Sequence, residues 1–479
     1  MSCPFDEARY LGLLKGLEIS EIQLSALERT SRFDSEFFLK SHLAVSKRLA
    51  QLPKNTVAAL TAISDGNHFA ISDEFVESGI PYYRGQDVVG NFFIEQATPT
   101  HITETAFRQP LMARSHLKQG DVLLSIIGTI GEASLVSSKT DATCSCKLAI
   151  LRPKKINPAF LASFLRSTFG RSQIVRYTRG AVQMGLLLED MDQILVPSTS
   201  DAFQLAIGNC VLAAQTFLNN AQSELKQGET TLLRGLNLET WQPPNPLSYT
   251  RSSADAFTAG RFDAEYFYPA KASAQAHLNA FPGKTIGSMF NSVRELWQPE
   301  NAPANQPVRN YDLNDALSPF LDDAKEPSYP TEIASTKKRI QKGDIVVSRL
   351  RSYLKEIAVV QADSKEPLVG STEFIVLRPK AGALPVEALL VFLRSTLPQL
   401  IFQWSQDGSN HPRFDEKELL NLHVPDAVSA IGKELTDSVN AATSARQRAK
   451  ELLEAAKRAV EIAIEDSETA ALAYLAEFS

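Results

Sequence analysis

The chain carries an internal duplication, and this feature constrains its fold more than any other. The segment Arg32–Phe38 (RFDSEFF) recurs at Arg261–Phe267 as RFDAEYF. Four further pairs follow in the same order: Lys118–Val122 with Gln341–Ile345, Leu151–Lys154 with Leu377–Lys380, Phe164–Thr168 with Phe392–Thr396, and Val196-Pro197 with Val424-Pro425. Collinear matches at a nearly constant offset along the chain predict two copies of one structural unit.

Each copy predicts a mixture of helices and strands. Apolar residues recur at helical spacing over 35–51 and 264–280, ahead of Pro53 and Pro282. Apolar and β-branched runs predict strands at 122–127, 147–151, 344–348 and 373–377, with short helices at 161–165 and 388–393 and a closing strand before Pro197 or Pro425. Because strands and helices do not alternate regularly, the expected class is α+β, built from two repeated mixed α/β domains, rather than a doubly wound sheet.

A long amphipathic helix is expected after each copy. Residues 199–235 and 428–476 place apolar side chains near a period of 3.5–3.6 residues. At 1.5 Å per residue these helices would extend for roughly 50 and 70 Å, although Gly208 and Gly228 weaken the first. We expect the two helices to pair as an antiparallel coiled coil that holds the copies apart. The alternative is that each helix only covers its own domain.

These patterns divide the chain into six segments. They are an N-terminal helical segment (1–52), a first mixed domain (53–197), a central long helix (198–237), a linker with the helical start of the second copy (238–281), a second mixed domain (282–425) and a C-terminal long helix (426–479). The long helices are the expected spacer between the two mixed domains.

The composition is that of an ordinary globular protein, with 44% hydrophobic and 22% charged residues. Four cysteines in 479 residues do not make a disulfide framework. No apolar run reaches the roughly 18 residues of a membrane helix, and Asp6 and Glu7 stand where a signal peptide would be basic. We therefore expect a cytoplasmic protein. Its net charge of −6 argues mildly against a surface that grips DNA phosphates throughout.

Sequence motifs for catalysis are missing. Gly128 and Gly131 lack the spacing and the Lys-Ser/Thr pair of a phosphate-binding loop. Ser125 stands in no Gly-x-Ser-x-Gly elbow, and Cys144 and Cys146 lack the further ligands of a zinc site. By elimination we expect a recognition module that has no catalytic site and itself binds no metal or cofactor.

Local clusters of basic residues point to nucleic acid nonetheless. Seven basic residues occur between residues 336 and 355 with Asp344 as the single acid: Lys337, Lys338, Arg339, Lys342, Arg349, Arg351 and Lys355. In the first copy four arginines occur without an acid, interleaved with aromatic residues: Arg166, Arg171, Arg176 and Arg179. Such clusters in an acidic protein predict localised phosphate contact. The alternative is a solvated basic face that is paired with neighbouring acids.

Three segments carry a resemblance to a known family: Gly79–Val88 (GIPYYRGQDV), Leu117–Ser125 (LKQGDVLLS) leading to Gly128–Gly131 (GTIG), and Arg261–Phe267. Together with the duplication, they resemble the specificity (S) subunits of type I restriction–modification systems. The resemblance implies two target-recognition domains that each read one half of an interrupted double-stranded DNA site from the major groove, and paired helices that fix the spacing.

The same resemblance implies partners. Two methyltransferase subunits would dock on the helices, bind S-adenosylmethionine and flip the target adenine, and translocase/nuclease subunits would join for cleavage. The S chain itself would not be catalytic. This division of labour accounts for the missing catalytic motifs, because base flipping would take place in the partner.

Candidate DNA-contacting residues come from the loops of both copies. They are Arg84, Gln86, Lys118, Arg179 and Gln183 in the first, and Arg309, Lys342, Arg349, Arg351, Asn410 and His411 in the second. These side chains offer the donors and acceptors that read base edges, and Gly180–Gln183 matches Gly408–His411 in position. Divergence between the copies is what two different half-sites require. The alternative for each residue is a loop side chain that meets only solvent or a phosphate.

Two other functions compete with this interpretation. One is a scaffold that binds no DNA and assembles other proteins through its helices. The other is a hydrolase that uses the strand-turn at Ser125. Salt-dependent binding to duplex DNA separates recognition from scaffolding, and co-purification with a methyltransferase separates both from the hydrolase.

Overall fold

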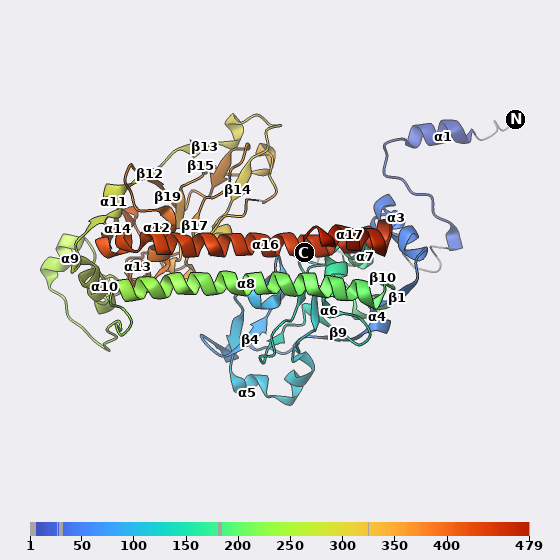
Figure 1. Cartoon of the computed structure of the whole chain (residues 1–479), viewed down its shortest axis with the longest axis horizontal. Helices are drawn as coiled ribbons and strands as arrows, with labels where there is room; N and C mark the ends of the chain where they lie inside the picture. The colour runs from blue at the N-terminus through green and yellow to red at the C-terminus, as the bar shows by residue number, and fades with distance from the viewer. Residues whose placement is uncertain (1–5, 26, 28–31, 181–183, 324, 479) are drawn as a thin grey trace. The chain divides into compact units, whose positions relative to one another are not determined.

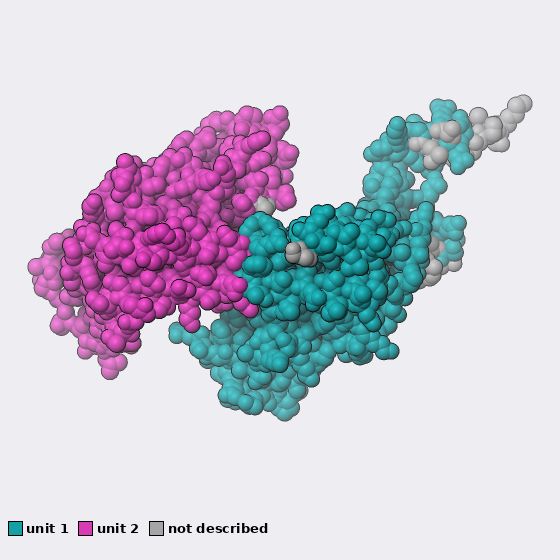
Figure 2. Space-filling model, viewed as in Figure 1, with its two compact units in different colours: residues 1–217, 447–479 teal, residues 218–446 magenta. Residues whose placement is uncertain are grey.

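The computed structural model describes residues 6–25, 27, 32–180, 184–323 and 325–478 (Figure 1). The chain divides into two compact units, residues 1–217 with 447–479 and residues 218–446 (Figure 2). Each unit therefore contains one copy of the duplication together with part of each long helix. Among the helices of the described residues, none combines the length and apolar character that a bilayer crossing requires.

Unit 1 is built from short strands and helices that precede the long helix α8. Its strands are β1 (Lys54–Thr56), β2 (Thr61–Asp65), β3 (Phe75–Val76), β4 (Ile80–Tyr83), β5 (Thr100–Ile102), β6 (Val122–Ser125), β7 (Ala133–Leu135), β8 (Thr143–Cys144), β9 (Leu148–Pro153) and β10 (Leu195–Pro197). Its helices are α1 (Glu7–Leu14), α3 (Lys40–Ala50), α4 (Val57–Leu60), α5 (Glu104–Phe107), α6 (Pro158–Arg166), α7 (Thr168–Tyr177), the start of α8 (Asp201–Gly235) and, from the C-terminal part of the chain, α17 (Glu468–Ala476).

Unit 2 repeats this order. Its strands are β11 (Gly283–Thr285), β12 (Phe290–Val293), β13 (Leu296–Trp297), β14 (Arg309–Tyr311), β15 (Lys337–Ile340), β16 (Ile345–Ser348), β17 (Ile357–Val359), β18 (Leu368–Gly370), β19 (Phe374–Pro379) and β20 (His423–Pro425). Its helices are α9 (Ser253–Ala259), α10 (Pro269–Asn279), α11 (Ile286–Met289), α12 (Val386–Arg394), α13 (Thr396–Gln403), α14 (Glu416–Leu420), α15 (Asp426–Ala430) and the start of α16 (Gly432–Glu465). The expected α+β class is confirmed.

The central sheet has the same antiparallel order in both units, β2-β9-β6-β7 and β12-β19-β16-β17. A two-stranded sheet, β1 with β10 or β11 with β20, joins the end of each copy to its beginning. The predicted strands at 122–127, 147–151, 344–348 and 373–377 fall on β6, β9, β16 and β19. The buried central strands β6 and β16 thus place the loop that follows them in equivalent positions.

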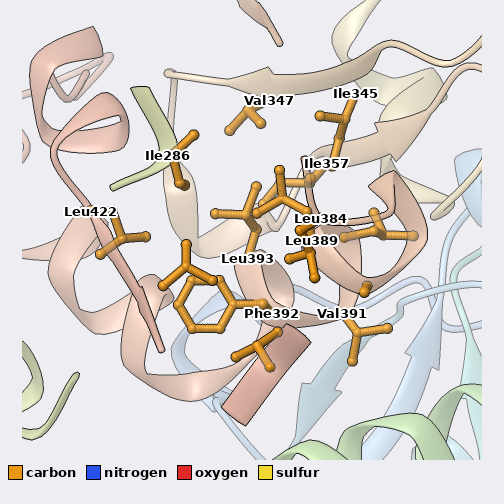
Figure 3. Packing of buried hydrophobic residues seen from close by; sticks show 14 of the residues in the cluster. Ile286, Ile345, Val347, Ile357, Leu384, Leu389, Val391, Phe392, Leu393 and Leu422 are labelled. Atoms are coloured by element: carbon orange, nitrogen blue, oxygen red, sulfur yellow. The ribbon is translucent and has the colours of Figure 1, made fainter. Parts of the chain in front are cut away.

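One helix packs on each central sheet and provides much of the core. Asn157 caps α6 by accepting hydrogen bonds from the N–H groups of Ala159 and Phe160, and Pro158 fits the first turn because its missing N–H needs no partner there. In unit 2, Leu389, Phe392 and Leu393 of α12 point into the same cluster as Ile345 and Val347 of β16 (Figure 3). Buried apolar side chains of this kind anchor the sheet and so fix its loops.

The long helices pair within each unit. In unit 1 the thiol of Cys210 on α8 donates to the carbonyl of Leu452 on α16 at 3.2 Å, and in unit 2 the hydroxyl of Ser438 on α16 donates to the carbonyl of Glu224 on α8. From Cys210 to Glu224 along α8, the partner on α16 changes from Leu452 to Ser438, which has a lower residue number. The two helices therefore run antiparallel. A Cβ on Gly228 would lie 3.0 Å from the Ser438 Oγ, which explains a glycine inside the helix.

The expected single helix over 428–476 is wrong. The segment divides into α15, α16 and α17, with α16 spanning 34 residues. The helix stops before Ser467, whose extended backbone and side chain cap α17 by accepting from the Ala470 N–H. The Arg448 guanidinium donates to the carbonyl of Phe478, so α17 folds back along α16 (Figure 1). By contrast α8 runs unbroken over 35 residues, which matches the expected length.

Candidate nucleic-acid interface

Two repeated sequence motifs meet in each unit as a buried ion pair. Arg152 donates to both oxygens of Asp121 at 2.8 and 2.7 Å, and Arg378 donates to both oxygens of Asp344 at 2.8 and 2.9 Å. Both carboxylates are fully buried, and their hydrogen bonds raise the pKa of Arg152 and of Arg378 above the ordinary value for arginine. A bidentate pair in such a site is costly to break, so these motifs serve folding.

The candidates Lys118 and Lys342 lie beside these pairs, ahead of β6 and β16. Lys118 is exposed, and Lys342 forms an ion pair with Asp363 at 2.9 Å. Most of the other candidates lie at the opposite ends of β6 and β16. The structure therefore does not bring Lys118 or Lys342 together with them, and Lys342 instead lies near Arg309, which donates to Ser364, the residue after Asp363.

Four candidates of the second copy come together at the end of β16. The turn 349–356 joins β16 to β17, and the loop 407–413 lies beside it because Leu350 and Asp407 each form a β-bridge with Arg413. The N–H of Arg351 donates to the carbonyl of Pro412 at 2.9 Å. Two loops thus place four side chains at one end of the central sheet: Arg349, Arg351, Asn410 and His411. Asn410 and His411 are exposed.

Glu373 neutralises part of this basic surface. The Nε of Arg349 donates to it at 2.9 Å, and Arg413 binds the same carboxylate through Nε and through Nη2, the latter at 2.8 Å. The hydrogen bonds from Arg413, joined by that of Arg349, outweigh burial and lower the pKa of Glu373 to about 2. Arg349 is consequently held within the protein and its charge is offset at neutral pH.

The first copy builds the same arrangement with other side chains. Ile127 and Arg179 each form a β-bridge with Gly185, as Leu350 and Asp407 do with Arg413. Arg179 pairs with the buried carboxylate of Asp190, and Gln183 lies outside the described residues.

The segment after β4 approaches this turn. A Cβ on Gly85 would lie 3.7 Å from the Ile127 carbonyl oxygen and 3.6 Å from the Lys147 Cβ. Its neighbours Arg84 and Gln86 therefore flank the turn 126–132, with the Gln86 side chain exposed and the Arg84 Nε 4.0 Å from Asp87. The structure brings Arg84, Gln86 and Arg179 to the end of β6.

Arg309 is placed differently from the other candidates. On β14 its guanidinium donates to Ser364 and Glu366 at 3.2 Å and to the carbonyls of Asp323 and Lys325. Only 18% of the side chain is exposed. Four acceptors within the protein hold it, so its geometry is that of a structural clamp between loops.

The four arginines of 166–179, from which the sequence predicted localised phosphate contact, are paired within the protein. Each has partners inside unit 1: Arg166 donates to the carbonyls of Asn91 and Ala133, Arg171 pairs with Glu132, Arg176 donates to the carbonyl of Phe37 and covers its ring, and Arg179 pairs with Asp190. Most of these partners come from segments distant in sequence, which is why the local run looked unpaired. These contacts stabilise the fold, and phosphate contact by the cluster stays a prediction.

Two exposed residues at these loops were not among the sequence candidates. Tyr353 is 58% exposed at the tip of the turn 349–356, and Lys147 is exposed beside Gly85. The sequence could have indicated Tyr353 through a difference in length between the copies. The turn between β16 and β17, which contains Tyr353, is one residue longer than the turn between β6 and β7. Alignment of the two copies marks this turn as a point of divergence.

The described residues contain no candidate metal centre, because no three His, Cys, Asp or Glu side chains among them are arranged to hold an ion. Cys144 is buried, and burial raises the pKa of its thiol. A protonated, buried thiol is a poor nucleophile and a poor ligand.

Comparison with known proteins finds likeness at the level of structure. No protein-family model and no curated protein matches the sequence. The S subunit of a type I restriction–modification system from M. genitalium matches at 14% identity over 86% of this chain and 94% of that chain, with a TM-score of 0.39. The HsdS subunit from Thermoanaerobacter tengcongensis matches at 14% identity over 88% and 96%, with a TM-score of 0.26.

A third match comes from work on complex assembly and conformational transition of the type I R-M system. It has 14% identity over 87% of this chain and 98% of that chain, and a TM-score of 0.29. With TM-scores below 0.5, these superpositions fix no residue-by-residue equivalence. The M. genitalium and T. tengcongensis proteins, each matched over most of this chain, are S subunits of restriction–modification systems.

Proposed function

We propose that the chain is a sequence-specific DNA-recognition subunit, in which two recognition domains read the two halves of an interrupted target. One observation carries the proposal: the same turn and loop follow the central strand of each copy, yet they display different side chains. Gly128 corresponds to Arg351 and Arg179 to Asp407. A rigid scaffold that presents variable loops is suited to reading base edges, and different loops suit different half-sites.

The chain would work with partners. Two methyltransferase subunits would supply S-adenosylmethionine and the chemistry, and translocase/nuclease subunits would add cleavage, in the cytoplasm. This chain would contribute recognition and no catalytic group. The docking of two methyltransferase copies is supported by two exposed aromatic residues at equivalent positions, Phe33 and Phe262. Their exposed fractions are 79% and 71%.

Both phenylalanines are held in the same way. Arg32 binds Asp34 at 2.6 and 2.9 Å and donates to the Thr178 carbonyl, while Arg261 binds Asp263 at 2.6 and 2.9 Å and donates to the Gln406 carbonyl. The flanking ion pair fixes the backbone and leaves each ring exposed. The two rings stand at equivalent positions, and that of Phe262 also packs edge-to-face on Phe257, with 5.4 Å between ring centroids. Exposed aromatic residues at both positions suit two copies of one partner, because aromatic residues often dominate interfaces.

The decisive experiment co-expresses the chain with the methyltransferase encoded beside it and maps methylated adenines across the host genome. A single interrupted motif is expected, and exchange of residues 282–425 for those of another such subunit should change only one half. If no methyltransferase associates and no duplex DNA is bound, the chain is a scaffold and the proposal fails.

A further inference from the structure

The turn that follows β16 has a strained backbone. Positive φ angles occur at three non-glycine positions among the described residues: 54° at Asn237, 46° at Arg351 and 53° at Lys355. Two of the three enclose a single 3-10 helix, Ser352–Leu354. Residues other than glycine rarely adopt this left-handed backbone region. Backbone strain of this kind often marks a functional site.

The first copy uses glycine at both corresponding positions. Gly128 is the third residue after β6, as Arg351 is after β16, and Gly131 is the second residue before β7, as Lys355 is before β17. Both glycines have φ of +89°. The fold therefore accepts the unstrained solution in this turn, and the second copy replaces it with two basic residues.

These two residues are also the ones of the basic cluster whose side chains lack a hydrogen bond or ion pair with any described residue, although Arg351 attracts the buried Glu356 carboxylate. Five of the seven basic side chains of 337–355 have partners within the protein: Lys337 with Asp312, Lys338 with the Phe374 carbonyl, Arg339 with Glu295, Lys342 with Asp363 and Arg349 with Glu373. Within the described part of the chain, the side chains of Arg351 and Lys355 make no hydrogen bond or ion pair, and the Nε of Arg351 is shielded without a partner. The exposed ring of Tyr353 lies between them in sequence.

The turn is held from beneath. The Ser348 N–H donates to the Glu356 carbonyl at 2.9 Å, and the partly buried Arg394 donates to the carbonyls of Lys355 and Ile357 at 2.8 and 2.9 Å. Glu356 is itself buried, and Arg351 acts on its carboxylate electrostatically. A turn fixed at both ends presents its side chains preorganised, which lowers the ordering cost of binding.

We infer that the turn Arg351–Lys355 is the specificity-determining element of the second recognition domain. Arg351 contacts a base edge, for which a guanidinium matches the two acceptors of guanine, and Lys355 contacts a phosphate beside it. Arg349, bound to Glu373, is not a reader. This inference rests on the proposed function and names the residues that carry it out in one half-site.

The test replaces each strained residue by the glycine of the first copy. In the co-expressed complex, Arg351→Gly should relax the methylated motif at one position by about 5- to 150-fold, the range for one bidentate base contact. Lys355→Gly should weaken binding to all duplexes alike and reduce the salt dependence of binding. Lys355→Gly should raise Tm, because glycine adopts the left-handed backbone without strain. Arg351→Gly loses the same strain but also the attraction to the buried Glu356 carboxylate.

Asn237→Gly provides a control, since Asn237 has the same left-handed backbone outside the turn, which asparagine adopts more readily than arginine or lysine. It should leave the motif and the affinity for duplex DNA unchanged. If Arg351→Gly and Lys355→Gly behave like Asn237→Gly, with the motif and duplex affinity intact, the inference is overturned while the proposed function stands. If the unmodified complex methylates no motif and binds no duplex, the proposed function itself has failed. Arg351→Lys keeps the positive charge but lacks the paired N–H donors of the guanidinium. It should relax the preference at the same position of the methylated motif, and it tests base contact by Arg351 without introducing a glycine into the turn.

Discussion

Cys210 donates its thiol hydrogen to the carbonyl of Leu452, and unit 2 repeats this contact with Ser438 and Glu224. The separation in sequence between Cys210 and Ser438 equals that between the repeated residues Val196 and Val424. Glu224 and Leu452 have the same separation. The same pair of positions is therefore used twice, once with the donor on α8 and once with the donor on α16. The duplication extends into the long helices, where no matching sequence motif reveals it.

The close approach of the helices makes Gly228 sensitive to substitution. In an open helix, Gly→Ala stabilises by about 1 kcal/mol. Here the new Cβ would lie 3.0 Å from the Ser438 Oγ, and moving that hydroxyl costs its hydrogen bond to Glu224, worth about 0.5–1.5 kcal/mol. Gly228→Ala should therefore fail to raise the free energy of unfolding. In a double-mutant cycle, adding Ser438→Ala should recover part of the gain; an undiminished gain from Gly228→Ala alone would contradict the tight contact.

The buried pair Asp344–Arg378 should be essential to the stability of unit 2. Asp344→Asn leaves the guanidinium of Arg378 without its bidentate partner, and breaking such a pair costs about 3–5 kcal/mol. The effect should lie towards the lower end because Arg378 is partly exposed. Denaturant unfolding measures it, and Asp363→Asn serves as the control because the pair it removes is exposed and should contribute little to stability. Equal losses in both variants would show that burial does not govern the pair.

Glu373 predicts a pH dependence that can be isolated by comparison with Glu373→Gln. Its pKa is lowered to about 2 from an ordinary value of 4.5, so folding favours the ionised form. Its stabilising contribution is fully present above pH 4.5 and is lost as the pH falls towards 2. The difference in unfolding free energy between the parent and Glu373→Gln should shrink over that window. A difference that stays constant from pH 6 to pH 2.5 would mean that Arg349 and Arg413 do not hold the carboxylate as described.

The sequence predicted the parts of the fold that depend on local pattern. Strands β6, β9, β16 and β19 follow from their apolar runs, and the repeated motifs located both copies. The break at Ser467 escaped prediction because the Ala-, Glu- and Leu-rich composition continues across it, and only the Ser467 cap, which accepts from the Ala470 N–H, shows where α17 begins.

The candidate interface was less accessible to sequence. A run of arginines shows charge but not partners: Arg166 bonds to Asn91 and Ala133, both of which lie in other segments of the chain. Likewise Arg349 and Arg351 look equivalent in sequence, and only the tertiary position of Glu373 separates them. The sequence of the second copy alone does not indicate that the backbone of Arg351 and Lys355 is left-handed. Only comparison of the two copies indicates it, because the first copy has glycine at both positions.

The exposed rings of Phe33 and Phe262 provide a prediction for partner docking. Each ring is exposed in this chain, so Phe33→Ala and Phe262→Ala should leave its Tm and its duplex affinity unchanged. Truncation of an aromatic anchor at an interface typically costs about 2 kcal/mol or more, which corresponds to about a 30-fold loss in affinity. Each single variant should therefore retain one methyltransferase copy under conditions in which the parent retains two, and the double variant should retain neither, as measured by the mass of the purified complex. The exposed Leu296 offers a control elsewhere in the second copy, and Leu296→Ala should keep both copies. Full stoichiometry in the double variant would assign docking to other surfaces.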